Sequence, residues 1–384
     1  MKKILLVSVL LPLLTLYFMS CSEDSPPEPQ LALSEKFQEA LDNGFESSNG
    51  KGVSAAIIMS DGEKWIGASG VSHGSTEITP DMRFGSGSMG KMFTAVTILQ
   101  LVDEGLLSLE DSLHKWLPAY CNIDSTINIR QLLNHTSGLP DQIDHPDYVT
   151  AIWANLMRFW TPEETITNFT AEPIFPKGTD WHYSNINYIL LGMIIEEVTG
   201  SDIAAEFRNR LFDPLNLDGT YFVEEESIPG SSAHGWVDLD EDGIFEDISS
   251  LSTVAMYSSG WTAGAQFSTA QDYVKWTQAL FHDNSVLSQH TLDQMLAFHS
   301  PCTGEEFLSA GYGLGVSLFQ PELVNNMVAW GHGGDGFGYS SVCIYLADYG
   351  VSIGIMDNTD GGQAMPSILS GFLSIITSHL KENP

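Results

Sequence analysis

Positively charged residues are scarce in this sequence. Only 15 Lys and Arg stand against 49 Asp and Glu in 384 residues, which gives a formal net charge of −34 at pH 7. Because this charge would repel a polyanion, we exclude a nucleic-acid partner. The acidity favours solubility and says little about the substrate.

Cysteine is scarce as well, with 4 in the chain. Cys21 belongs to the N-terminal segment described next. The other three, Cys121, Cys302 and Cys343, lack the spacing of metal ligands. Since three thiols form at most one disulfide, we expect buried free thiols rather than a disulfide framework.

Long apolar runs are almost absent, apart from residues 4–19. This run is short for a membrane-spanning helix; Lys2 and Lys3 precede it, and Ser20 and Cys21 follow it. Residues 17–21 resemble a bacterial lipobox, with Phe at the place where Leu is usual. We therefore expect residues 1–20 to be a lipoprotein signal peptide, cleaved before Cys21, which is then lipidated. A plain secretory signal is the alternative.

The segment after Cys21 is rich in proline and acidic residues. Ser22-Glu23-Asp24 resembles the acidic tag that some Gram-negative bacteria use for lipoprotein export, and residues 25–30 predict a stiff, extended tether. We interpret residues 21–32 as a tether. The expected location is the bacterial cell envelope, at the periplasmic or surface face of the outer membrane, with membrane contact through the lipid anchor alone.

The segment from Arg83 to Val102 carries the strongest functional signal. A Gly/Ser turn precedes an apolar helical pattern, so Ser88 and Lys91 fall three apart on one face of the first turn. Serine attacks a carbonyl only when a neighbouring base takes its proton, and a desolvated lysine amine can do so. The N–H groups at the helix start suit an oxyanion. Ser88 is therefore predicted to be an acylated nucleophile.

The Ser-x-x-Lys spacing is weak evidence by itself, because it occurs four times in the chain. The other three pairs begin at Ser48, Ser112 and Ser378, and none of them opens a buried helix after a glycine turn. The alternative for Ser88 is an ordinary helix cap.

A second candidate element is Tyr183-Ser-Asn185, at the start of an apolar helical pattern that closes at Gly200. A phenol beside a lysine ammonium is stabilised as phenolate and can take the proton of the serine. The Asn185 amide suits an amide or acylamino group of the substrate. A second Tyr-x-Asn, Tyr120 to Asn122, lacks the glycine turn and the helix.

The third element is His332-Gly333-Gly334-Asp335. Glycines let a substrate lie close to the backbone, and His332 supplies positive charge or a hydrogen bond toward a carboxylate. The backbone N–H of Asp335 pairs with that of Ser88 as an oxyanion site. A glycine-rich hairpin with an exposed histidine is the alternative.

Two further features remain outside these elements. His135 has no obvious acid or nucleophile beside it, so we expect a structural, hydrogen-bonded histidine. Asp238, Asp240 and Asp242 alternate before a glycine as in a calcium loop, but Ser249 stands where the bidentate glutamate belongs. Calcium binding and an acidic surface loop both remain open.

The order of expected elements indicates the fold class. Helical periodicity begins near Leu33, strands are expected at 53–58 and 64–67, and the middle of the chain is mostly helical. Strands follow at 311–319, 327–330, 340–346 and 351–356, with a final helix at 368–380. This order predicts an α+β domain spanning 33–384, whose antiparallel sheet is made from both chain ends and flanked by helices.

The three elements occur in the order found in serine β-lactamases and penicillin-binding proteins, which the chain resembles over about residues 35–380. It looks closest to the class C-like branch, which includes D-alanyl-D-alanine carboxypeptidases, D-aminopeptidases and carboxylesterases. The resemblance implies that Ser88 is acylated, that Lys91 and Tyr183 move its proton, and that Asn185 binds the substrate amide. It implies no metal or other cofactor. His332, where many β-lactamases carry lysine, is typical of the peptidase and esterase members.

These observations predict a monomeric serine hydrolase for a small peptide, ester or β-lactam. A D-alanyl-D-alanine carboxypeptidase or related D-peptidase comes first. A carboxylesterase or class C-like β-lactamase is the alternative enzyme, and a catalytically silent muropeptide-binding protein is the alternative without catalysis.

Overall fold

Residues from both ends of the chain form one antiparallel sheet in the computed structural model, which describes residues 32–223, 225–299 and 309–382. The strand order is β3-β2-β1-β13-β12-β11-β10-β9. The bounds are β1 (Gly52–Ile58), β2 (Lys64–His73), β3 (Thr76–Glu77), β9 (Ser309–Tyr312), β10 (Ser317–Phe319), β11 (Ala329–Gly336), β12 (Tyr339–Leu346) and β13 (Val351–Asp357). The predicted α+β class and the sheet from both chain ends are confirmed.

Strand β1 joins the two ends of the chain at the centre of this sheet. It pairs with β13 from Val53↔Asp357 to Ile58↔Ser352, and every one of its residues is buried. The predicted hairpin at Asp61-Gly62 links β1 to β2. A strand buried on both faces is mainly apolar rather than alternating, which matches the sequence of β1 apart from Ser54.

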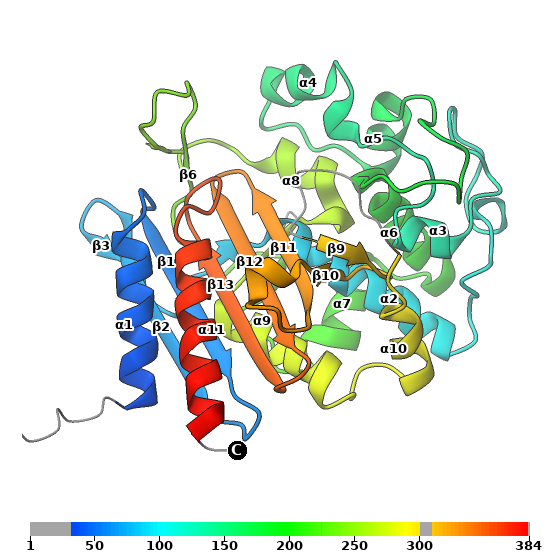
Figure 1. Ribbon diagram of the computed structural model, residues 1–384. Helices are drawn as coiled ribbons and strands as arrows, with labels where there is room; N and C mark the ends of the chain where they lie inside the picture. Colours follow the sequence, from blue (N-terminus) through cyan, green and yellow to red (C-terminus); the bar gives the residue numbers. More distant parts are fainter. Residues whose placement is uncertain (1–31, 224, 300–308, 383–384) are drawn as a thin grey trace, which may run out of the picture. The chain divides into compact units, whose positions relative to one another are not determined.

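Helices cover both faces of the sheet (Figure 1). Helices α1 (Leu33–Glu46) and α11 (Met365–Glu382) pack side by side on one face, where Phe37 and Phe372 lie in the core. Helix α9 (Ala270–Thr277) packs against β1, β12 and β13 on the other face. The sheet is therefore the middle layer, and its second face carries the site.

The middle of the chain is mostly helical, as predicted. Helices α2 (Lys91–Asp103) and α6 (Asn185–Thr199) are almost wholly buried and pack against each other. The remaining α-helices are α3 (Ile129–Leu133), α4 (Tyr148–Ala154), α5 (Pro162–Phe169), α7 (Ile203–Phe207), α8 (Val254–Gly260) and α10 (Gln289–Met295). A capping box between Thr161 and Glu164 starts α5, which confirms the prediction from the sequence.

Short strands complete the architecture. A three-stranded sheet has the order β4-β8-β5, and a two-stranded ribbon pairs β6 with β7. Their bounds are β4 (Phe84–Gly85), β5 (Tyr221–Phe222), β6 (Trp236–Val237), β7 (Glu246–Asp247) and β8 (Gln266–Ser268). Strand β4 leads directly into the turn that carries Ser88, so this small sheet fixes the approach to the site.

Three local predictions were wrong. The single strand expected at 311–319 is two strands, β9 and β10, because the chain turns between them at Gly315, which has φ +80°. The strand expected at 327–330 continues to Gly336, since pairing with β12 overrides the weak strand propensity of its glycines. Helix α9 is capped by Thr269, whose side chain accepts from the N–H of Asp272, and not by Ser268, the cap expected from the sequence.

The predictions for residues 1–31, including the signal peptide and lipidated Cys21, lie outside the described residues, as does Cys302. Cys121 and Cys343 are free thiols; Cys343 is buried and Cys121 is exposed. None of the helices in the described ranges combines the length and apolarity needed to cross a membrane.

Candidate active site

Ser88 lies in a tight turn that connects β4 to α2 and packs against β11. The turn is a 3₁₀ helix, η1 (Gly87–Gly90), and α2 begins only at Lys91, so Ser88 precedes the helix on which it was expected. Gly87 has φ +50°, and a Cβ there would collide with the carbonyl of Asp335. A Cβ on Gly334 would likewise collide with the carbonyl of Ser86. Glycine at both positions lets η1 lie against β11.

This contact brings together the first and third elements predicted from the sequence. The hydroxyl of Ser341 donates to the carbonyl of Ser86 at 2.9 Å and ties β12 to the same turn. Strand β10 pairs with β11 at residues 330 and 331, ahead of the part of β11 that lies beside the turn. The backbone of Asp335 is in contact with Gly87, directly before Ser88. The two N–H groups predicted for the oxyanion site therefore belong to adjoining segments.

Lys91 is fully buried and sits among three oxygen atoms. Its Nζ lies 3.0 Å from Ser88 Oγ, 2.5 Å from Asn185 Oδ1 and 2.7 Å from the carbonyl oxygen of Ala263. Carbonyl oxygens only accept hydrogen bonds, so a neutral amine would give its two N–H groups to Asn185 and Ala263. Its lone pair is then left for the hydroxyl of Ser88.

The environment of Lys91 also raises the fraction of lysine that is in the neutral amine form near pH 7. Burial lowers the pKa of Lys91 to about 7, while the carboxylate of Asp141 acts in the opposite direction. A general base works best when its pKa is near the working pH. Lys91 thus has both the geometry and the proton affinity of a base for Ser88.

Tyr183 approaches the same pair from the second element. Its ring centre lies 4.8 Å from Lys91 Nζ. Burial raises the pKa of Tyr183 well above its usual value, and a hydrogen bond with Ser88 opposes this only in part. The raised pKa therefore favours a neutral phenol, in place of the phenolate expected from the sequence.

Asn185 is the first residue of α6, and both the oxygen and the nitrogen of its side-chain amide are hydrogen-bonded. Its Oδ1 accepts from Lys91, and its Nδ2 lies 2.9 Å from Asp141 Oδ2. Its backbone N–H donates to the same oxygen at 3.2 Å. The side chain is consequently held between an amine and a carboxylate, which leaves it less free to bind a substrate amide than the sequence suggested.

Asp141 is a functional candidate that sequence reasoning missed. It lies just after Pro140, is 8% exposed, and accepts the N–H of Ile143 in a tight turn, η3 (Gln142–Asp144). In the sequence an aspartate at such a place is typical of a helix cap. Its contact with Asn185, 44 residues away, exists only in the fold.

His332 is buried within β11 instead of facing a substrate. Its Nε2 is 2.9 Å from the hydroxyl of Tyr312, and its Nδ1 is 2.5 Å from the carbonyl of Gly333. Burial lowers the pKa of His332 to about 3. The imidazole is therefore neutral at pH 7, and the positive charge that was one of its predicted roles does not fit. Tyr312 was not foreseen as its partner.

Gly333 differs from its neighbour Gly334. A Cβ at Gly333 would have only one described atom within 4 Å, the carbonyl oxygen of Ser341 at 3.8 Å. Packing within the protein therefore requires glycine at 334 but leaves room at 333.

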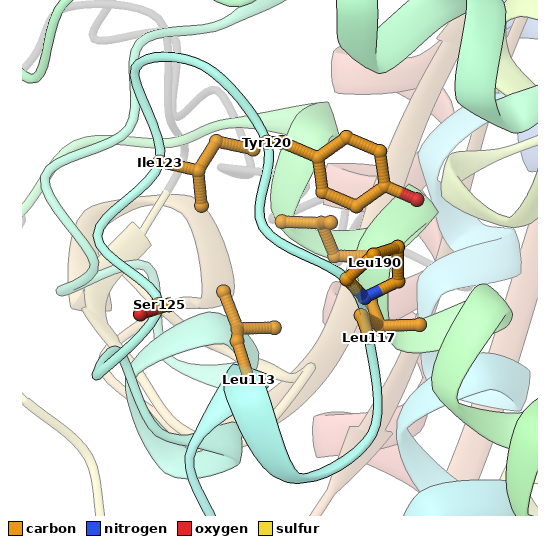
Figure 2. A pocket seen from close by; sticks show the side chains of 7 residues that line it. Leu113, Leu117, Tyr120, Ile123, Ser125 and Leu190 are labelled. Atoms are coloured by element: carbon orange, nitrogen blue, oxygen red, sulfur yellow. The ribbon is translucent and has the colours of Figure 1, made fainter.

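The other highlighted residues take no part in the hydrogen bonds of Lys91, although the ring centre of His135 lies 4.3 Å from that of Tyr183. His135 is buried and accepts from the N–H of Ser184 through Nδ1, which confirms the structural, hydrogen-bonded role predicted for it. Tyr120 of the second Tyr-x-Asn lies in an apolar hollow with Leu113 and Leu190 (Figure 2). That hollow includes none of the residues that hydrogen-bond to Lys91.

The three aspartates of the acidic loop do approach one another. Asp238, Asp240 and Asp242 each offer an oxygen within 4.8 Å of the others, between β6 and β7. The carboxylate of Asp238 accepts the backbone N–H groups of Asp242 and Gly243. These bonds are those of an acidic turn, and the choice between calcium loop and surface loop stays open.

A serine hydroxyl in contact with a buried lysine of lowered pKa, beside a phenol and strand β11, defines the class of serine hydrolases that use lysine as base. The chain belongs to the Beta-lactamase family, whose family model matches residues 37–368. The Ser88, Tyr183 and His332 elements lie within that range. The resemblance to serine β-lactamases and penicillin-binding proteins is thereby shown, and the class C-like branch fits.

Curated relatives include penicillin-binding proteins. The chain is 28% identical to penicillin-binding protein 4 of Amycolatopsis lactamdurans, with 85% of each chain covered. It is 28% identical to penicillin-binding protein 4* of Bacillus subtilis over 71% of this chain and 60% of that one. The chain thus spans less than two thirds of the Bacillus protein.

Solved structures confirm the fold. D-amino acid amidase from Ochrobactrum anthropi SV3, complexed with L-phenylalanine amide, superposes with a TM-score of 0.78 at 26% identity, covering 92% of this chain and 99% of that one. D-stereospecific amidohydrolase from Streptomyces sp. gives a TM-score of 0.77 at 30% identity, covering 90% and 99%. By their names, the first is an amidase for D-amino acids and the second is a D-stereospecific amidohydrolase.

Proposed function

We propose that this protein is a serine hydrolase that forms an acyl-enzyme at Ser88 and cleaves amide bonds of D-amino-acid peptides. A D-alanyl-D-alanine carboxypeptidase or a related D-peptidase is the activity to test first. The observation that carries the proposal is the position of Lys91 Nζ, 3.0 Å from Ser88 Oγ and held by two carbonyl oxygens. The names of the D-amino acid amidase and amidohydrolase neighbours support a D-amino-acid substrate.

The chemistry follows from these contacts. The amine of Lys91 takes the proton of Ser88 as Oγ bonds to the substrate carbonyl carbon, and the N–H groups of Ser88 and Asp335 hold the resulting oxyanion. The C–N bond then breaks, and the leaving amine takes its proton from Lys91 through the phenol of Tyr183. Water then bonds to the ester carbonyl carbon and gives its proton to Lys91. Lys91 passes this proton to Ser88 Oγ as the C–Oγ bond breaks, which releases the acid and regenerates free Ser88.

A second candidate is a carboxylesterase or an amidase for substrates without a free carboxylate. The neutral, buried state of His332 favours it, because the third element then offers no positive charge to a carboxylate. A class C-like β-lactamase is less favoured for the same reason. We further propose that the protein is lipid-anchored in the cell envelope through Cys21, on the basis of the sequence of residues 1–32. A monomer is proposed as well.

The test is intact mass after incubation with benzylpenicillin, with the Ser88→Ala variant alongside. A penicilloyl adduct that is absent from the variant supports the nucleophile and a slowly deacylating carboxypeptidase. The same samples are then assayed with D-alanyl-D-alanine peptides, D-alanine p-nitroanilide and p-nitrophenyl esters, which separate peptidase, amidase and esterase. A fluorophosphonate label that persists in Ser88→Ala would contradict the proposal.

Ser112 provides a matched control, since it precedes Lys115 at the same spacing on an exposed turn. Ser112→Ala should keep both the adduct and the turnover. If no substrate is turned over and no adduct forms, the silent muropeptide-binding protein becomes the better interpretation.

A further inference from the structure

Among the residues that the structure describes, Asp141 is a carboxylate near the site that has no step in the proposed reaction. Asp141 is buried and accepts hydrogen bonds from Ile143 and from Asn185, which in turn contacts Lys91. Both N–H donors of Asn185, backbone and side chain, point to its carboxylate at 3.2 and 2.9 Å. A buried carboxylate without partners would be costly, so this pairing is a specific arrangement.

Asn185 connects this carboxylate to the base. Its Oδ1 accepts from Lys91 Nζ at 2.5 Å while its Nδ2 donates to Asp141. With the amide turned around, a donor would face the lysine and the carboxylate would face an oxygen. Asp141 therefore selects the orientation of Asn185 that leaves a carbonyl oxygen for Lys91.

The groups around the pair carry little competing charge. Tyr183 and Tyr148 are phenols whose pKa burial raises, and Asp141 itself adds to the shift of both. His135 and His332 are imidazoles whose pKa burial lowers. All four are neutral near pH 7, so the charge that opposes the burial of Lys91 is that of Asp141. Burial raises the pKa of Asp141 itself, while the hydrogen bonds from Ile143 and Asn185 and the charge of Lys91 favour its carboxylate form.

We propose that Asp141 is a positioning residue for the reaction at Ser88, which orients Asn185 toward Lys91 and, by its charge, sets the pH at which Lys91 becomes a base. This inference rests on the proposed function for its catalytic meaning. The negative charge favours the ammonium form of Lys91, so its removal should make the neutral amine available at lower pH.

Removing the charge of Asp141 should lower the pH at which activity rises. Activity that needs neutral Lys91 rises with pH through the pKa of that lysine. In Asp141→Asn, the oxygen of the new amide can still accept both N–H groups of Asn185, while the charge is lost. The acidic limb of kcat/KM should move to lower pH by about one unit. An orienting role alone would lower kcat without moving the limb.

The experiment measures two quantities separately: the acidic limb of the pH–rate profile and the pKa of Lys91. Rates are measured from pH 5 to 9 with D-alanine p-nitroanilide, for the wild type and for Asp141→Asn. The pKa of Lys91 is measured by NMR on protein with ¹³C-labelled lysine, with the signal assigned from Lys91→Met. Both the limb and the titration of Lys91 should shift to lower pH in Asp141→Asn.

Asp144→Asn is the matched control. Asp144 lies three residues along the same turn, its side chain is 65% exposed, and its partner is His182 at 3.7 Å. This variant should leave both the limb and the Lys91 titration in place. If Asp141→Asn does not fold by circular dichroism, Asp141→Ser, which also removes the charge, carries the same test.

The outcomes separate the two proposals. A wild type that shows neither turnover nor an adduct defeats the proposed function, while the NMR titration still tests Asp141. Turnover with an unchanged Lys91 titration in Asp141→Asn overturns the role of Asp141 and leaves the function standing. A shift of the same size in Asp144→Asn would also overturn it, since the effect would then be one of general charge.

Discussion

The side-chain nitrogen of Lys91 lies 3.0 Å from the hydroxyl oxygen of Ser88, in a position where burial brings the pKa of the lysine to about 7. The two residues are three apart in the sequence, yet they lie on different helices, since Ser88 is in η1 and Lys91 opens α2. The change of helix type between them positions the hydroxyl beside the amine.

Replacing Lys91 should remove the base without removing the nucleophile. Lys91→Met is expected to lower kcat/KM by about 10²–10⁴-fold, the usual contribution of general base catalysis. Steady-state kinetics with D-alanine p-nitroanilide measure the loss. Lys115→Met serves as control, because Lys115 is 49% exposed and pairs with Asp111. Comparable losses in the two variants would contradict the assignment of Lys91.

Removing the hydroxyl of Tyr312 should weaken the fold around the third element. Tyr312→Phe removes the group bonded to His332 Nε2, and losing a partner of a buried polar group costs about 1–3 kcal/mol. Chemical unfolding measures the change. Tyr221→Phe, which removes an exposed hydroxyl bonded to the carbonyl of Asp218, should change little.

The same Tyr312→Phe variant also tests the neutral state of His332. Because the pKa of His332 is about 3, this histidine should not titrate between pH 5 and 9 in the wild type. The acidic limb of the activity profile should therefore stay in place in the variant. A limb that moves with Tyr312→Phe would show that His332 carries charge in the working range.

The two glycines after His332 should respond differently to alanine. In Gly334→Ala the new methyl group meets the carbonyl of Ser86, so we expect destabilisation by about 1–3 kcal/mol or more, with loss of acylation at Ser88. In Gly333→Ala there is room, so the free energy of unfolding should stay close to that of the wild type. Urea unfolding of both variants provides the comparison, and equal destabilisation would refute it.

Asp357 should make stability depend on pH. It is buried at the end of β13, where burial raises its pKa to about 7, above a value of about 4 for an unfolded aspartate. Between these values the folded protein keeps the proton that the unfolded chain loses. This contribution to stability is therefore complete below about pH 4 and is lost as the pH rises to about 7.

The size of the Asp357 effect follows from the two pKa values. About three units correspond to something on the order of 4 kcal/mol, so Asp357→Asn should be more stable than the wild type at pH 8 and should show a flatter dependence of Tm between pH 4 and 7. Calorimetric melting across this range measures it. Asp348→Asn, at an exposed turn between β12 and β13, should leave the slope unchanged; an unchanged slope in Asp357→Asn as well would contradict the prediction.

Local patterns predicted much of this protein. The apolar run around β1, the hairpin at Asp61-Gly62 and the capping box at Thr161 depend on neighbouring residues, so the sequence indicates them directly. The pairing of the two chain ends followed from the order of the expected strands. Ser88, Lys91, Tyr183 and Asn185 were chosen from their local context, and the fold brings all four together.

What the sequence left undecided depends on contacts between distant segments. Asp141 meets Asn185 across 44 residues, and His332 meets Tyr312 across 20. Burial and hydrogen bonding at these contacts shift the pKa values of Asp141 and His332, and these shifts cannot be derived from residue type. The sequence by itself determined the elements and the candidate nucleophile with its base. Only the tertiary structure decided that His332 and Tyr183 are neutral. It also decided that Asp141 hydrogen-bonds to Asn185, which contacts the base Lys91.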